Sequence, residues 1–226
     1  VWRQGLTQGL NVLLPALLPG IVWYAVQQEI TVFMVILGCG LMAAILRYTV
    51  SLPKAIVASV VLGGAVVLLL PVLSPVWFEM LQQGSDQYQK ALIEKMPQAA
   101  ATLQPWILPL LLGGVAALLQ LFAIGAVLMA RKWQSALFNP GEFAKEFNTL
   151  RLPYWYGLMA VLMLFIGTSS LTFVSLVPVV LVPLFVMGLS LVHGLVAIRQ
   201  WNKQWLMTFY IALVFFMPYM YALLIL

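Results

Sequence analysis

Charged side chains are scarce in this sequence. Asp, Glu, Lys and Arg make up only 8% of the 226 residues, whereas a soluble domain carries roughly a quarter. So few charges cannot cover a folded chain with a polar surface, which excludes an ordinary water-soluble domain. The hydrophobic fraction of 64% predicts instead that the chain uses a lipid bilayer as its solvent.

Cysteine and histidine are nearly absent, since the chain holds only Cys39 and His193. These counts exclude a disulfide framework and metal sites built from cysteine or several histidines. The sequence has no Gly-rich phosphate loop followed by Lys, and no Ser–His–Asp arrangement that apolar spans could assemble. It also lacks a basic platform for nucleic acid. We therefore expect no enzymatic activity, no cofactor and no metal.

Long apolar runs dominate the chain. A transmembrane helix needs about 20 mostly apolar residues, and this length predicts an all-α polytopic helix bundle in one integral membrane domain, residues 1–226. Pro15 and Pro19 predict a kink in the first span, and Pro71 and Pro75 predict the end of the third. Because the chain begins with Val1, we also expect an upstream N-terminal span to be missing. The seven predicted spans are 6–26, 30–46, 55–73, 106–129, 154–167, 173–198 and 205–226.

The segment 74–105 is the longest polar stretch. Its apolar residues, among them Trp77, Leu81, Tyr88 and Leu92, recur near helical spacing. This pattern predicts two short amphipathic helices, broken around Gly84, that lie on the membrane surface.

Basic residues are distributed unevenly among the loops. Only Lys90 and Lys95 fall in 74–105, beside several acidic residues. The positive-inside rule therefore places loops 47–54, 130–153 and 199–204 in the cytoplasm and loop 74–105 outside, in a bacterial inner membrane. The nine basic residues on the predicted cytoplasmic side are Arg3, Arg47, Lys54, Arg131, Lys132, Lys145, Arg151, Arg199 and Lys203.

The loop 130–153 mixes charges of both signs with aromatic residues. Asn139 as N-cap, Pro140 at the first position and Glu142 at the third predict a helix start, and the helix should continue to about residue 150. Phe143, Phe147 and Leu150 form one apolar stripe along it.

Glu142 and Glu146 form a like-charge i,i+4 pair on this helix, which predicts a neighbouring basic group, either Arg131 or Lys132. Two interpretations stay open. One is a docking helix for a cytoplasmic partner, and the other is an interfacial connector that lies on the bilayer. The docking interpretation would use Arg131, Trp133, Asn139, Phe143, Phe147 and Arg151.

A few polar residues lie within or beside the apolar runs. His193 is an ionisable group inside a span, and such groups are functional candidates, although a neutral imidazole bonded to a neighbouring helix is the alternative. Gln120 must find a partner in the bundle. If the chain binds a solute, we expect a solvent-reachable cavity lined by Gln120, Ser169, Thr172 or His193.

Several short motifs of the loop are those of a known family. Residues 130–134 (ARKWQ), 139–141 (NPG), 146–147 (EF) and 150–152 (LRL) resemble the cytoplasmic signature of the YybS-like family of bacterial membrane proteins. The resemblance implies an additional N-terminal span. It also implies a distant similarity to the substrate-binding components of energy-coupling-factor transporters and to MreD, which are six-helix bundles that bind a vitamin-like ligand or a partner protein. Seven predicted spans depart from that pattern.

Three functions follow as hypotheses. The first is a transporter-type membrane component that holds a small solute and presents its cytoplasmic loops to partner subunits. The second is a membrane scaffold with no solute pathway, which assembles with other membrane proteins or with itself through faces of small residues. The third is a membrane-embedded enzyme that acts on lipid. A filled, dry bundle would favour the scaffold.

Overall fold

We describe the fold from a computed structural model that places residues 6–202 and 204–226, with the backbone alone for residues 6–8, 99 and 172. Regular structure within these ranges is helical throughout, and the helices are joined by short turns. They are α1 (Leu6–Gln27), α2 (Thr31–Thr49), α3 (Leu52–Leu73), α4 (Pro75–Lys95), α5 (Pro97–Phe138), α6 (Glu142–Asn148), α7 (Tyr154–Ser169), α8 (Leu171–Val174), α9 (Leu176–Ile198), α10 (Gln204–Phe215) and α11 (Met217–Ile225).

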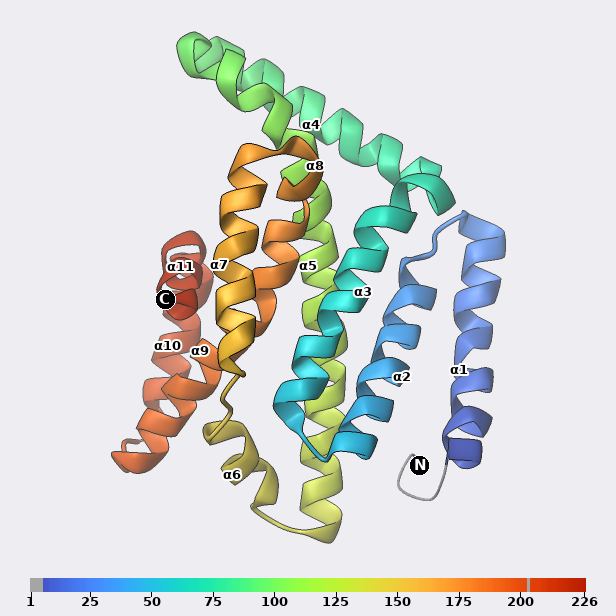
Figure 1. The fold of residues 1–226 in the computed structure, drawn as a ribbon, viewed down its shortest axis with the longest axis vertical. Coiled ribbons are helices and arrows are strands. Elements are labelled where there is room, and N and C mark those ends of the chain that lie inside the picture. Colours follow the sequence, from blue (N-terminus) through green and yellow to red (C-terminus); the bar gives the residue numbers. More distant parts are fainter. Residues whose placement is uncertain (1–5, 203) are drawn as a thin grey trace.

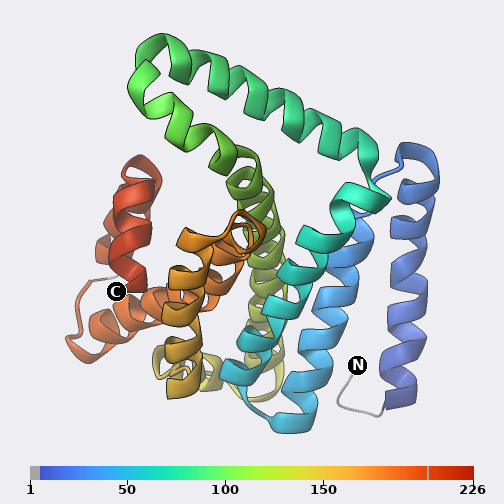
Figure 2. The same cartoon turned by 45° about the horizontal axis from the view of Figure 1, so that its top comes forward.

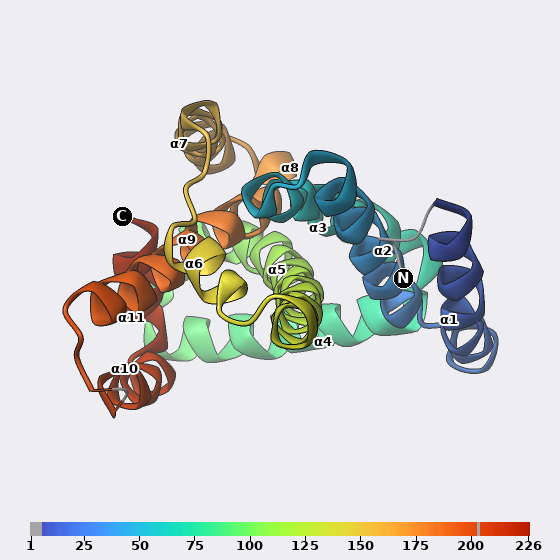
Figure 3. The same cartoon turned by 90° about the horizontal axis from the view of Figure 1, so that it is seen from below.

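Helix α5 is the centre of the bundle. It packs against α2, α3 and α9 in the body of the molecule, and against α4 and α6 at its two ends (Figures 1 and 3). Its 42 residues correspond to about 63 Å at 1.5 Å per residue. A bilayer core is only about 30 Å thick, so α5 is longer than a single crossing requires.

The outer faces of the long helices are strongly apolar. Leu68, Phe122 and Leu158 are each about 70% exposed, and water would be a poor solvent for such a surface. Five helices of the described chain are long and apolar enough to cross a membrane, namely α1, α2, α3, α5 and α9. The predicted all-α polytopic bundle is confirmed: the chain is a multi-pass membrane protein.

The seventh predicted span is not one straight helix. The chain bends by 115° between α10 and α11, and Pro218 lies in the first turn of α11. A proline at that point lacks the amide that would continue α10, and its ring opposes the preceding turn. The fifth predicted span, α7, has 16 residues, so it is apolar but shorter than each of the five helices that are long enough to cross a membrane.

The predicted break at Gly84 is wrong. One helix, α4, runs through Gly84 and ends at Met96, whose φ of −144° and ψ of 66° are not helical. Met96 precedes Pro97, and a residue before proline is driven out of the helical region. Helix α4 and the start of α5 therefore form a hairpin that crosses one end of the bundle (Figure 2).

Two further boundaries differ from the prediction. Residues 130–138 continue α5, so the connector begins only at Asn139, which caps the end of α5 and does not start α6. Gly141, with a φ of 87°, precedes Glu142 at the beginning of α6. The predicted end of the third span at residue 73 is confirmed, since α3 runs through Pro71 to Leu73, and a membrane helix tolerates an interior proline.

Candidate functional site

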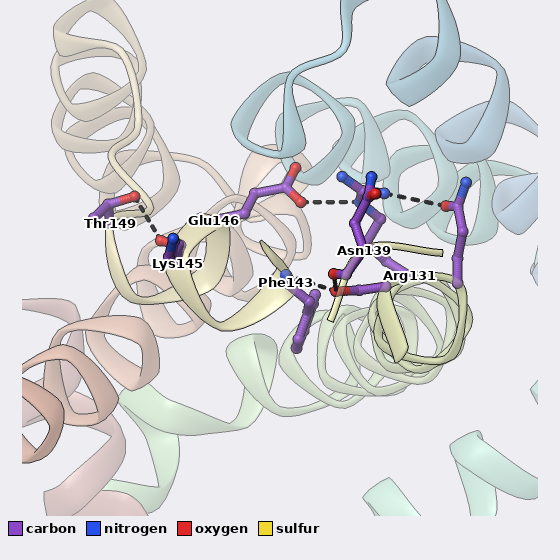
Figure 4. A network of polar contacts seen from close by, with 8 residues as sticks. Arg131, Asn139, Phe143, Lys145, Glu146 and Thr149 are labelled. Carbon is purple, nitrogen blue, oxygen red and sulfur yellow. Dashed lines mark hydrogen bonds and ion pairs between the residues drawn. The ribbon is translucent and has the colours of Figure 1, made fainter. Parts of the chain in front are cut away.

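One serine joins the end of α5 to the start of α6. The Ser135 hydroxyl donates to the Asn139 carbonyl at 2.8 Å and accepts from the Phe143 amide at 3.0 Å. Figure 4 shows this turn from close by. Ser135 therefore performs the capping that the sequence assigns to Asn139, and it fixes the direction in which α6 leaves α5.

An ion pair holds the side of α6 against α5. Arg131 Nε lies 2.9 Å from Glu146 Oε2, and both side chains are about one-fifth exposed. The prediction of a basic neighbour for the Glu142–Glu146 pair is confirmed, with Arg131 in that role. Lys132, the other candidate, forms no ion pair with a described carboxylate and stays free to act elsewhere.

The end of α6 is anchored on α9. Ser190 Oγ donates to the Phe147 carbonyl at 2.6 Å, and a Cβ atom at Gly194 would lie 2.8 Å from the Asn148 carbonyl oxygen. Ser190 and Gly194 lie one turn apart on α9 and are small, so the backbone of α6 can pack closely against α9 at this point. The predicted apolar stripe packs inward, since Leu150 is buried and Phe147 meets His193 edge to face at 5.5 Å.

These contacts leave a cavity, partly open to the surroundings, between α6, α9 and α10. Its volume is about 670 Å³, which lies within the usual range of small-molecule sites. Phe143 and Phe147 form one wall, stacked at 5.7 Å, and Leu206 and Tyr210 belong to the wall opposite, on α10.

A polar pair crosses this cavity. His193 Nε2 and Tyr210 Oη are 2.8 Å apart and share a hydrogen bond whose direction depends on the imidazole tautomer. His193 therefore makes the contact that the alternative interpretation predicts, a hydrogen bond between its imidazole and a neighbouring helix. The same contact places both groups in the lining of the cavity.

The turn after α9 positions a further aromatic residue. The Trp201 amide donates to the Val196 carbonyl at 3.0 Å and the Gln200 amide donates to the Ala197 carbonyl at 3.3 Å. Gln200 has a φ of 52°, so these bonds form a Schellman motif with Gln200 in the left-handed position. The motif directs Gln200 and Trp201 into the lining of the cavity.

The cavity lies at the basic end of the bundle. The α2–α3 turn, the α5–α6 connector and the α9–α10 turn share this end, while α4 lies at the other (Figure 1). Glu142 and Glu146 are the acidic residues of its connector. The described basic residues of this end are Arg47, Lys54, Arg131, Lys132, Lys145, Arg151 and Arg199; Arg3 and Lys203 lie outside the described residues.

The structure does not bring the predicted substrate-binding residues together. Gln120 is fully buried in the core, where its amide donates to Ser59 Oγ at 2.8 Å. Ser169 is exposed at the opposite end of the bundle and bonds the Phe165 carbonyl of its own helix. The side chain of Thr172 lies outside the described residues. Of this set, only His193 reaches the cavity.

The predicted partner-binding residues divide into two groups. Arg131, Phe143 and Phe147 hold α6 to the bundle or line the cavity. The other group is exposed on the surface and consists of Trp133, Asn139 and Arg151. Local spacing in the sequence does not predict the roles of Tyr210, Trp201 and Ser190. Each of these residues makes its contact across a turn or a helix interface.

Comparison with protein-family models, curated proteins and solved structures finds no match to this chain.

Proposed function

We propose that this chain is a non-enzymatic component of a bacterial inner-membrane transport system, which holds a small solute in the cavity between α6, α9 and α10. The observation that carries the proposal is the cavity itself, with its apolar walls, one polar pair and one cation, Lys132, that forms no ion pair with a described carboxylate. This mixture of an apolar lining with a few convergent polar groups is typical of small-molecule sites. The resemblance of the loop to the YybS-like family would fit either a transport-associated or a scaffold role.

The proposed orientation places the cavity at the cytoplasmic face. Seven described basic residues lie at its end of the bundle, and the positive-inside rule favours the cytoplasm for such an end. A solute held there would be exchanged with the cytoplasm or with a partner subunit that contacts the exposed residues Trp133 and Arg151.

The core favours binding over conduction. Gln120, Ala116 and Ala123 of α5 are fully buried, so the middle of the bundle is filled by packed side chains. The same observation favours the second candidate, a scaffold with no solute pathway. In our proposal the chain is a binding component, and movement of the solute across the membrane requires a partner.

Native purification followed by mass spectrometry tests the proposal. Ala197 lines the cavity and is exposed, so Ala197→Trp should fill the space without disturbing the core. We expect a small molecule to co-purify with the natural chain and to be lost from this variant. Ala91→Trp, on the exposed surface of α4, is the matched control and should retain it. Co-purified proteins without any small molecule would support the scaffold and reject the binding role.

A further inference from the structure

The lining of the cavity is divided between an apolar body and a few polar groups. Phe143, Phe147, Val196, Trp201 and Leu206 supply most of the walls. A ligand that fills this space must therefore present apolar or aromatic surface over most of its area.

The aromatic walls alone would attract a cation. The faces of phenylalanine and tryptophan rings are electron-rich and bind ammonium groups. The charge of the lining opposes this preference, because Lys132 is its charged member and none of the described lining residues is acidic. The sign of the ligand's charge therefore depends on which effect is larger.

Lys132 is available to a ligand. Its neighbour Arg131 is neutralised by Glu146 at 2.9 Å, whereas no described carboxylate forms an ion pair with Lys132. The surrounding basic residues add a positive field, which raises the local concentration of anions near the cavity. An ammonium group directed at an anion forms a charge-assisted bond of roughly twice the strength of a neutral one.

Neutral donors are also present. Asn148 and Gln200 contribute side-chain amides to the lining. The Tyr210 hydroxyl can donate to a ligand oxygen when His193 Nε2 carries the proton of their shared 2.8 Å bond, because the tyrosine oxygen then acts as the acceptor from histidine. An anionic ligand would favour that tautomer.

We propose that the cavity takes an amphipathic anion, with a carboxylate or phosphate group bound by Lys132 and an apolar or aromatic body between α6 and α10. This inference rests on the proposed solute-binding function and adds the chemical class of the solute. Lys132 determines the sign of the charge, and the aromatic walls determine the apolar character of the body.

A series of probes with one body and different charges tests the inference. Fluorinated phenylbutyrate, phenylbutanol and phenylbutylamine are added to the full chain in phosphatidylcholine nanodiscs, and fluorine NMR measures their dissociation constants. We expect phenylbutyrate to bind about three- to tenfold more tightly than phenylbutylamine, a range that corresponds to one solvent-exposed charge-assisted contact. The difference should shrink at high salt.

Substitutions at Lys132 assign the effect to one residue. Lys132→Met should remove the preference for phenylbutyrate, and Lys132→Arg should keep it. Lys145→Met removes a charge from the exposed surface of α6 outside the cavity lining and is the matched control, which should retain most of the preference.

The outcomes separate this inference from the proposed function. Equal binding of both charged probes, or tighter binding of the amine, together with loss of all binding in Ala197→Trp, would overturn the anion class and leave a solute site in place. Probe binding that Ala197→Trp does not reduce would overturn both. An anion preference that Lys132→Met removes supports the inference.

The anionic group could belong to a free solute or to a lipid headgroup. Repeating the phenylbutyrate titration in phosphatidylglycerol nanodiscs distinguishes these sources. Competition by this lipid assigns the site to an anionic headgroup, and undiminished binding assigns it to a free solute. Both results support the anion class.

Discussion

At the scale of single residues, Gln120 and Gly63 mark one of the close helix contacts in the core. Gln120 donates to Ser59 Oγ, while its own Oε1 atom is buried and has no hydrogen-bond partner among the described residues. A Cβ atom at Gly63 would lie 2.8 Å from that oxygen and 2.4 Å from Val179 Cγ1. Glycine is required at this point because α3, α5 and α9 meet there.

The first prediction concerns this contact. Gly63→Ala should lower the free energy of unfolding by about 1–3 kcal/mol, the usual cost of overpacking a core, because the stiff side chain of Val179 cannot move away. Gly64→Ala is the matched control, since a Cβ atom there meets nothing within 4 Å. Unfolding in mixed detergent micelles measures both, and equal effects of the two substitutions would contradict the packing described here.

The second prediction concerns Gln120 itself. Gln120→Leu removes the bond to Ser59 but also removes the unpartnered Oε1 atom. These effects oppose each other, so the free energy of unfolding should change by less than about 1 kcal/mol. Gln120→Leu should also leave binding of the co-purified solute unchanged, because Gln120 lies outside the cavity. A large loss of binding in the folded variant would place the solute in the core and contradict the assignment.

Residue-scale predictions from the sequence succeeded where a contact is set by local spacing. The like-charge pair on α6 indicated a basic partner, and Arg131 fills that role. The bond from Ser190 to the Phe147 carbonyl joins positions that are 43 residues apart. No periodicity in the chain predicts that α6 folds back onto α9, so this contact required the structure.

At the scale of elements, prolines end some helices and lie inside others. Met96 and Asn139 end helices directly before Pro97 and Pro140. Pro71 and Pro183, however, lie within continuous helices. A sequence marks each proline as a possible break, but whether neighbouring helices compensate for the lost hydrogen bond depends on packing that local patterns do not contain.

The third prediction tests the continuity of α4. Gly84→Pro should disrupt the helix and cost about 3 kcal/mol locally, because proline removes one helical bond and crowds the preceding turn. Gly84→Ala should keep the helix, since a Cβ atom at Gly84 meets nothing within 4 Å. Amide hydrogen exchange along α4 reports the difference. Equal exchange in the two variants would restore the two-helix interpretation of this segment.

The fourth prediction tests the junction of α5 and α6. Ser135→Ala removes both hydrogen bonds of the Ser135 hydroxyl, and a lost cap costs about 0.5–2 kcal/mol. Faster exchange of the Phe143 amide and weaker solute binding should follow, because α6 forms a wall of the cavity. Ser169→Ala is the control, since the Ser169 hydroxyl donates to the Phe165 carbonyl of its own helix. Unaltered exchange at Phe143 would remove Ser135 from this role.

At the scale of the whole molecule, charge divides the bundle into two ends. The sequence predicts this division correctly in space, because the loops 47–54 and 130–153 lie at the end opposite α4. The bend between α10 and α11 could not be predicted from the sequence, since a run of apolar residues is compatible with both a straight span and a bent pair.

The fifth prediction concerns sidedness. Cys39 is the single cysteine of the chain, so Cys39→Ser provides a background for new labels. Lys90→Cys, on α4, should react with an impermeant maleimide in intact cells, and Lys145→Cys, on α6, should react only after permeabilisation. The reverse pattern would invert the proposed orientation and place the cavity outside.

The central claim is that the cavity between α6, α9 and α10 holds a small solute. Photocrosslinking tests it most directly. Benzoylphenylalanine at position 143 replaces a cavity-lining aromatic residue, and the same group at position 133 replaces the exposed Trp133. After irradiation in native membranes, we predict a small-molecule adduct at position 143 that is absent at position 133 and is lost with Ala197→Trp. Capture of a protein at position 143, with no small-molecule adduct, would contradict the solute site and identify α6 as a docking helix.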